Sequence, residues 1–295
     1  MRKDNFLKEL KESTIKNIIK FYKTGNQLSG GWAAVLRSAI NRFGEVYATQ
    51  AAASIAYYTF FSIFPLLILL AALGSFFLEG DQIQNQIAFW VNTIFPPAAD
   101  LVEQTLSYVI QQRKSAGITG MIGLLWAGSA AFIALGRNIT LAWPKAHQRD
   151  FLRGRLMAFA MIASIIALLI GSIIVTTVVR VSSVFELSLL GGNLMGNLLS
   201  WLMTFITMIS LYRWLPTETV RWKHAAWGAL LATVGWHTAA IGFSWYLSSG
   251  LARYDLIYGT LSAVIVLLFW IYISALIILF GAHFTAALCR KRRRK

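Results

Sequence analysis

Long uncharged stretches dominate the chain from Val46 onward and are separated by short polar segments. A helix needs about 20 residues to cross the ~30 Å hydrocarbon core of a bilayer. Six stretches are long enough, at residues 46–78, 115–136, 156–179, 187–212, 225–252 and 256–289. Because backbone polar groups in lipid must bond within the protein, the pattern predicts an all-α polytopic membrane protein, a six-transmembrane-helix bundle.

The residues before the first predicted span are basic and partly amphipathic. Apolar positions recur at helical spacing over 6–22 and, more regularly, over 32–43. Two interpretations stand, and both can hold: interfacial helices on anionic cytoplasmic lipid, or helices packed beneath the bundle. The chain thus divides into a basic amphipathic segment (1–45), a transmembrane domain (46–289) and a basic tail (290–295).

Positive charge is concentrated in alternate segments between the predicted spans. Residues 1–45, 137–155, 213–224 and 290–295 hold 23 of the 27 Lys and Arg residues, whereas acidic residues divide evenly between the two sides. Cytoplasmic loops carry an excess of Lys and Arg, so both termini are predicted to be cytoplasmic. This topology accounts for the net charge of +15 without nucleic acid as a partner.

Composition points the same way. The chain is 57% hydrophobic and 13% charged, whereas about a quarter of the residues in soluble domains are charged. A soluble protein this apolar would expose large apolar patches and aggregate.

The longest predicted external segment joins the first two spans. Apolar stripes at 83–94 and 101–109 lie on either side of Pro96 and Pro97. Consecutive prolines end a helix, so two short amphipathic helices are expected on the outer face. They either pack at the interface or cap a cavity.

Sites for catalysis, metals or cofactors are poorly supported. The six predicted spans contain no Asp or Glu, which excludes a carboxylate proton relay or a two-metal site at membrane depth. The four histidines form neither an HxH nor an HExxH pattern, and Cys289 is the single cysteine. A Walker-type motif is absent, so we expect no catalytic residue, no metal and no cofactor.

Polar residues inside the spans are the functional candidates, because burying them in lipid is costly. Tyr58 shares one helix face with residues four positions before and after it, so this face is expected to point inward. Pro65 is expected to free a carbonyl near Phe61. These residues serve either interhelical hydrogen bonding or a polar substrate path. The full set is Ser54, Tyr57, Tyr58, Ser62, Pro65, Arg137, Asn138, His237, Tyr258 and His283.

Three of these candidates carry open alternatives. His237 is predicted near the bilayer midplane, where it bonds a neighbouring helix or faces a polar cavity. Arg137 ends the second span, where it snorkels to headgroups or binds an anion. His283 is predicted near the cytoplasmic interface, mainly in a structural role. His224 is expected to be solvated in a loop.

Small and aromatic residues add two expectations. Small residues in the fifth span predict close helix packing. They are Gly228, Ala232, Gly235 and Ala239. The inner aromatic belt is expected to contain Trp143, Trp214, Trp222 and Trp227, and the outer one Trp90, Trp245, Tyr246 and Tyr258.

Several stretches resemble the YihY / virulence factor BrkB family. They are AASIAYYTFFSIFPLLILLAALG (52–74), LGRNITLAW (135–143), LYRWLPTETVRWKHAAWGAL (211–230) and IYGTLSAVIVLLFWIYISALIILFGAHF (257–284). The resemblance implies a six-helix bacterial inner-membrane protein. The family was formerly misnamed ribonuclease BN, and links to serum resistance and envelope lipid transport have been suggested for it. Family members commonly have Glu where this chain has His283.

Three functional hypotheses follow. The first is transport or handling of lipids or another envelope component, with anionic cytoplasmic headgroups as partners. The second is a non-catalytic envelope scaffold or assembly protein, with a homo-oligomer or an envelope protein as partner. The third, a membrane enzyme such as a nuclease, lacks a nucleophile–base pair or a metal constellation in the sequence.

Overall fold

The computed structural model describes residues 31–74, 118–164, 166, 192–249 and 261–293, and every regular element within them is a helix. The all-α class is therefore confirmed for the part described. The helices are α2 (Trp32–Glu45), α3 (Ala48–Gly74), α6 (Ile118–Thr140), α8 (Gly192–Trp214), α9 (Trp222–Ser248) and α11 (Ser262–Arg293), with a further helix over 151–164.

Several predicted features lie outside the described residues. They are the amphipathic stretch at 6–22, the external stripes at 83–94 and 101–109, Trp90, and Tyr258.

Two of the described helices contain segments long and apolar enough to cross a membrane. They are Ile122–Thr140, with a mean hydropathy of 1.3, and Ser262–Arg290, with a mean hydropathy of 2.9. At about 1.5 Å per residue, the second segment exceeds the thickness of the hydrocarbon core. The other four predicted spans each include residues outside the described ranges, so the count of six stays a prediction.

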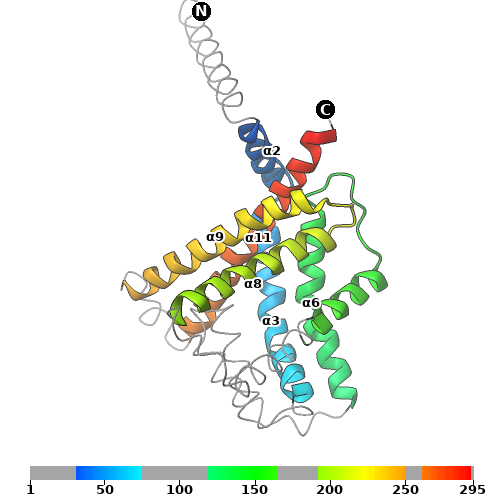
Figure 1. Cartoon of the computed structure of the whole chain (residues 1–295). Coiled ribbons are helices and arrows are strands. Elements are labelled where there is room, and N and C mark those ends of the chain that lie inside the picture. The colour runs from blue at the N-terminus through cyan, green and yellow to red at the C-terminus, as the bar shows by residue number, and fades with distance from the viewer. Residues whose placement is uncertain (1–30, 75–117, 165, 167–191, 250–260, 294–295) are drawn as a thin grey trace, which may run out of the picture.

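Helix α11 occupies the centre of the fold. It packs against α2, α3 and α9, while α3 pairs with α6 and α8 pairs with α9 (Figure 1). The α8–α9 pair crosses α3 and α6 obliquely (Figure 1). From Gly281 to Ala287 every residue of α11 is buried, so this half of the helix has neighbours on all sides.

Glycines set the distance between α9 and α11. A Cβ atom on Gly228 would overlap the Thr285 hydroxyl and lie 2.9 Å from the carbonyl oxygen of Gly281. A Cβ atom on Gly235 would lie 3.3 Å from Ile277. The predicted close packing at Gly228 and Gly235 is confirmed, because the two backbones approach where side chains are smallest.

Tyr212 fixes the end of α8 to the same region. Its buried hydroxyl donates a hydrogen bond to the carbonyl oxygen of Ile278 at 2.9 Å. A Cβ atom on Gly281 would overlap this hydroxyl. The missing side chain of Gly281 therefore makes room for a buried tyrosine that joins α8 to α11.

Helix α2 has one packed and one exposed apolar face. Val35 and Ala39 are buried against Phe284 of α11, which confirms packing against the bundle. Leu36 and Ile40 are 43% and 53% exposed, and this apolar face is free to contact lipid as the alternative interpretation requires.

We predict that Gly228→Ala destabilises the protein, whereas Gly242→Ala on the same helix does not. The methyl group at 228 forces α9 from α11, and overpacking of this kind costs about 1–3 kcal/mol. A Cβ atom on Gly242 meets nothing within 4 Å. Alanine there gains up to about 1 kcal/mol in helix propensity. Thermal unfolding in one detergent measures both variants, and equal midpoints would contradict the packing described.

Candidate functional site

The polar residues of α3 differ in burial: Ser62 is buried against α6, whereas Tyr57 and Tyr58 lie on an exposed face. Ser62 is 3% exposed; its hydroxyl donates to the Ala127 carbonyl at 3.2 Å and accepts from the Ala131 amide at 3.3 Å. Tyr58 is 45% exposed, so the expectation that it points inward with Ser62 is wrong. Tyr57 is exposed as well, and its ring contacts the Tyr58 ring on the outside of α3.

Ser62 thus serves interhelical hydrogen bonding between α3 and α6. Ser54 and Pro65 are half-buried, and Pro65 lies within α3, which continues to Gly74.

His237 lies between α8 and α9. Its imidazole stacks on the Trp201 ring, with centroids 4.2 Å apart and an interplanar angle of 6°. Its Nε2 atom is buried without a hydrogen-bond partner among the described residues. This contact ties two helices together by ring stacking and brings His237 to no other predicted site residue.

The candidates at the end of α6 also lie apart. The Arg137 side chain is exposed, and the Asn138 amide donates to the Ala134 carbonyl one turn earlier, at 2.9 Å. Ser62, His237 and His283 each contact different elements, so the predicted residues that the structure describes do not form one site.

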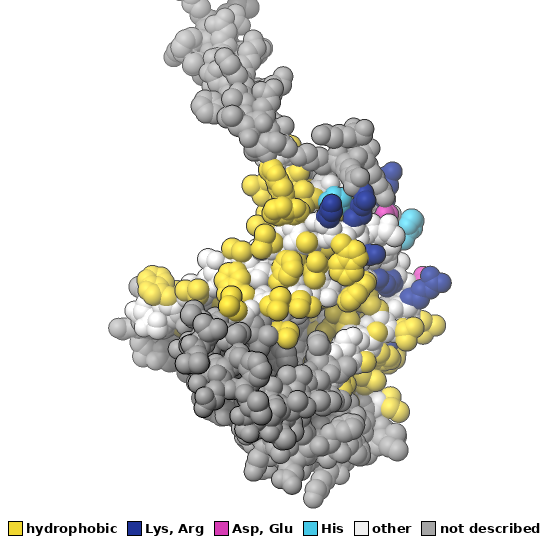
Figure 2. Space-filling view, in the orientation of Figure 1, with side chains coloured by type: hydrophobic (Ala, Val, Ile, Leu, Met, Phe, Trp, Pro, Cys, Tyr) yellow, Lys and Arg dark blue, Asp and Glu magenta, His cyan; other side chains and the backbone are white. Residues whose placement is uncertain are grey.

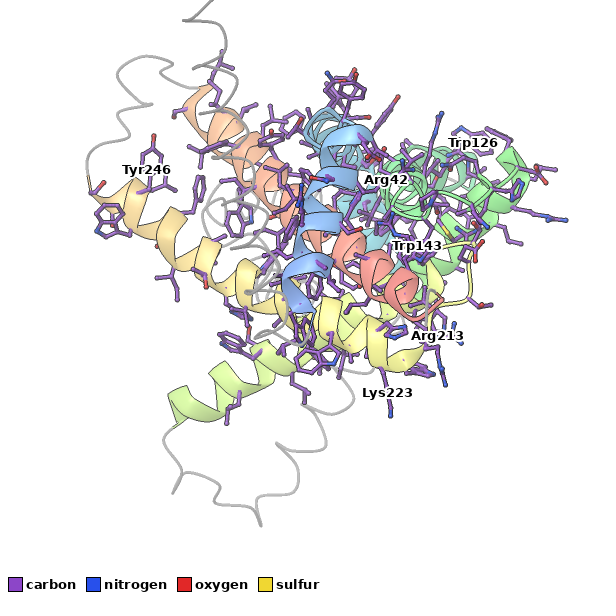
Figure 3. The ribbon with its side chains drawn as sticks, turned by 90° about the horizontal axis from the view of Figure 1, so that it is seen from above. Arg42, Trp126, Trp143, Arg213, Lys223 and Tyr246 are labelled. Atoms are coloured by element: carbon purple, nitrogen blue, oxygen red, sulfur yellow. The ribbon has the colours of Figure 1, made fainter. Side chains whose placement is uncertain are left out.

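Basic side chains from the segments predicted to be cytoplasmic gather at one end of the bundle, although the sequence did not show which of them lie close together. We call this end the basic end, and it comprises Arg42, Arg149, Arg213, Lys223 and Arg290. Figure 3 shows Arg42, Trp143, Arg213 and Lys223 around the C-terminal half of α11, with Tyr246 at the far end of α9. Basic side chains gather here above an apolar surface (Figure 2).

Backbone carbonyls hold Arg149 at the basic end. Its guanidinium donates to the carbonyls of Leu215 and Trp214, at the C-terminus of α8. A cation is favourable there because helix C-terminal carbonyls carry partial negative charge. Burial lowers the pKa of the Arg149 guanidinium from its ordinary value, because desolvation disfavours the charged form.

Arg155 joins the 151–164 helix to α6. Its guanidinium carbon lies 3.8 Å from the ring centroid of Trp126, whose carbonyl accepts a hydrogen bond from it at 2.9 Å. It also donates to the hydroxyl of Ser129, which is fully buried. One side chain therefore combines a cation–π contact with two hydrogen bonds.

His283 and Arg42 occupy the junction of α2 and α11. His283 is 0% exposed, its Nδ1 atom lies 2.7 Å from the Leu279 carbonyl oxygen, and its ring contacts Phe43. Arg42 donates to the Leu141 carbonyl at 3.3 Å. Arg42 and Arg290 both act electrostatically on the imidazole. The amphipathic pattern over 32–43 did not single out Arg42 as part of a site.

The aromatic belt needs one correction. Trp214, Trp222 and Trp227 are at least half exposed near the basic end, whereas Trp143 is 7% exposed. Trp143 belongs to the core, packed with Ile139 and neighbouring apolar residues, because the chain after α6 turns back over the bundle. At the opposite end of α9, Trp245 is 64% exposed.

His224 is also placed differently from expectation. It lies in the first turn of α9, half-buried, with its Nδ1 atom 3.4 Å from the Cys289 sulfur. The prediction of a solvated loop histidine is therefore wrong. No group of three or more His, Cys, Asp and Glu side chains that could hold a metal occurs in the described ranges.

Helices with apolar, outward-facing surfaces and a charged end define a helical membrane protein. A family model for virulence factor BrkB matches residues 39–295, and the chain belongs to this family. A UPF0761 membrane protein of Tolumonas auensis is 28% identical over 242 residues, covering 80% of this chain and 79% of that protein.

Two further relatives carry the same name. One from Haemophilus influenzae is 27% identical over 254 residues, covering 84% of this chain and 92% of its own length. One from Aliivibrio fischeri is 30% identical over 252 residues, covering 81% of this chain and 78% of its own length. No solved structure matches the chain significantly.

We predict that Arg155→Met lowers stability and Arg153→Met does not. Loss of the Trp126 and Ser129 contacts is expected to cost about 1–3 kcal/mol. Arg153 is two positions earlier on the same helix; its side chain is 82% exposed and pairs only loosely with Asp150 at 3.8 Å. Its loss is expected to change stability by less than about 0.5 kcal/mol. Chemical unfolding in detergent measures both, and a similar loss in the two variants would contradict this account.

Proposed function

We propose that this protein is a non-catalytic, multi-pass inner-membrane protein that binds anionic envelope lipids and takes part in their movement. The observation that carries the proposal is the basic end, where guanidinium groups are set among carbonyl oxygens beside exposed tryptophans. Lipid headgroups with phosphate match such a surface in charge, and tryptophans are favoured at headgroup depth.

The charge of the basic end supports this proposal. The Asp and Glu residues in the described ranges are Glu45, Asp150 and Glu218. The bonds of Arg149 to carbonyl groups orient its guanidinium without neutralising it. Lys and Arg outnumber these three carboxylates in the described ranges, and the excess charge is available to anionic lipid, at about 1 kcal/mol per Lys or Arg near the membrane surface.

The apolar sides of the helices support the same proposal. Large apolar residues on α8 and α9 are exposed beneath the basic end, and Figure 2 shows hydrophobic side chains spread below the basic ones. They include Leu198, Leu202, Ile206, Leu230, Val234 and Ile241. Acyl chains are the natural neighbours of this surface, while the headgroups reach the arginines.

The basic end is assigned to the cytoplasm in this proposal, with both chain termini on that side. The loops after α6 and α8 are joined at this end by a hydrogen bond from the Thr217 hydroxyl to the His147 carbonyl, at 2.9 Å. The excess of Lys and Arg in these loops favours cytoplasmic placement.

Reporter fusions test the topology. We expect green fluorescent protein fused after Lys295 to fluoresce, since this reporter folds in the cytoplasm. Alkaline phosphatase is expected to be active when fused after Arg180 and inactive when fused after Ala146. Phosphatase activity after Ala146, with none after Arg180, would reverse the assignment.

Lipid movement is tested in proteoliposomes. A fluorescent phosphatidylglycerol analogue in both leaflets is reduced by dithionite from outside, and movement makes the inner pool accessible. We expect faster loss of inner-leaflet fluorescence with the protein than in empty vesicles. The effect should be stronger for phosphatidylglycerol than for the zwitterionic phosphatidylcholine analogue. Equal rates with and without protein would reject the proposed activity.

A further inference from the structure

The junction of α2 and α11 brings positive charge and unsatisfied polar atoms together inside the basic end. Val35 and Ala39 pack against α11, which brings the last turn of α2 beside His283. The Phe43 ring lies 5.4 Å from the imidazole, and Arg42 is the preceding residue. Two segments far apart in the sequence are thereby placed around one point.

Arg42 is incompletely satisfied by the residues that the structure describes. Its Nη1 atom lies 3.4 Å from a carboxylate oxygen of Glu45, whose side chain is 63% exposed, so this ion pair is weak. Its Nη2 atom reaches the Leu141 carbonyl at 3.3 Å, a long bond. Its Nε atom is buried with no acceptor among the described residues. A buried guanidinium N–H without an acceptor is costly, and an anion would satisfy it.

His283 supplies a second unsatisfied atom. Since the Leu279 carbonyl is only an acceptor, Nδ1 carries a proton and donates to it. Nε2 is buried with no partner in the described part of the chain, and the whole residue is 0% exposed. In this neutral tautomer Nε2 is an acceptor, and Arg42 and Arg290 are close enough to act electrostatically on the imidazole. The junction therefore combines an unsatisfied guanidinium N–H, the positive charge of Arg42 and Arg290, and a neutral imidazole.

The surroundings distinguish a lipid phosphate from a free ion. On α2, Trp32, Leu36 and Ile40 are exposed, and the Trp32 ring contacts Trp227 at 5.1 Å. This apolar strip lies on the helix that carries Arg42, whose side chain is 23% exposed and so reaches the surface. A phosphate attached to acyl chains would contact both Arg42 and the apolar strip, whereas inorganic phosphate would contact only Arg42.

We propose that Arg42 and His283 form a binding site for the phosphate group of an anionic phospholipid, with Arg290 adding positive charge and the apolar strip of α2 contacting the acyl chains. Arg42 Nε–H donates to a phosphate oxygen. The bound anion favours uptake of a proton from water by the neutral His283, whose Nε2–H then donates to a second phosphate oxygen. The inference deepens the proposed function, because it assigns that function a specific lipid group and specific residues.

Binding to the full-length protein in uncharged detergent tests the site. Isothermal titration calorimetry uses mixed micelles of phosphatidylglycerol, mixed micelles of phosphatidylcholine, and inorganic phosphate as separate probes. We expect saturable binding of phosphatidylglycerol only. Inorganic phosphate binding as tightly as the lipid would overturn the assignment to a lipid, and no saturable binding of any probe would overturn the site.

Two variants and a matched control decide which residues bind. His283→Glu places a carboxylate where the phosphate is proposed to lie, and Arg42→Gln removes its main donor. Each is expected to weaken phosphatidylglycerol binding about tenfold or more, as for loss of a charge-assisted hydrogen bond. Arg37→Gln, at an exposed position of the same helix, removes the same charge and should change binding less than about threefold.

Thermal unfolding separates binding from folding. His283→Glu should keep the unfolding midpoint of the wild type, because the new carboxylate pairs with the neighbouring arginines. Equal weakening by Arg37→Gln and Arg42→Gln would overturn the site in favour of diffuse attraction. If both site variants move lipid at the wild-type rate, the proposed site is rejected but the proposed function is kept. Specific binding without any lipid movement would reject the proposed function and keep the site.

Discussion

The close approach of α9 to α11 is the contact on which the remaining structure depends. Gly228, Gly281 and Thr285 meet there at distances that leave no room for a further side-chain atom. In lipid, apolar side chains gain little from leaving the solvent, so helices associate through packing and interhelical hydrogen bonds. With the backbones this close, the Tyr212 hydroxyl reaches the Ile278 carbonyl and fixes α8 as well.

The basic end follows from this packing. The C-terminal half of α11 lies beside α2, the start of α9 and the end of α6 (Figure 1). Charges from five separate segments (α2, the loop after α6, α8, α9 and α11) are thereby collected at one end. Arginine suits this place because its planar group bonds several carbonyls at once, as Arg149 does at the end of α8.

His283 illustrates how burial and charge meet at this end. It lies in the fully packed half of α11, so its ring is held by Phe43 and its Nδ1 atom by Leu279. Its neighbours Arg42 and Arg290 come from different elements and are both cationic. The proposed lipid phosphate adds negative charge at this junction, beyond the exposed carboxylate of Glu45.

The sequence by itself determined the helical class, the membrane as solvent and the concentration of basic residues on alternate segments, because each depends on local composition and spacing. It also placed small residues where α9 packs, since Gly228 and Gly235 recur on one helix face. It did not determine which polar residues are buried: Tyr58 is exposed and Trp143 is buried, although both looked otherwise. The spacing of residues in a helix determines which side chains share a face, but not which face packs against a neighbouring helix.

Only the tertiary structure joined Arg42 to His283 and Arg149 to the end of α8, because these pairs are far apart in the chain. It also separated Ser62, His237 and His283, which the sequence had grouped by chemical type. The difference is physical: hydropathy and charge act on each segment locally, whereas a site depends on contacts between segments that only packing creates.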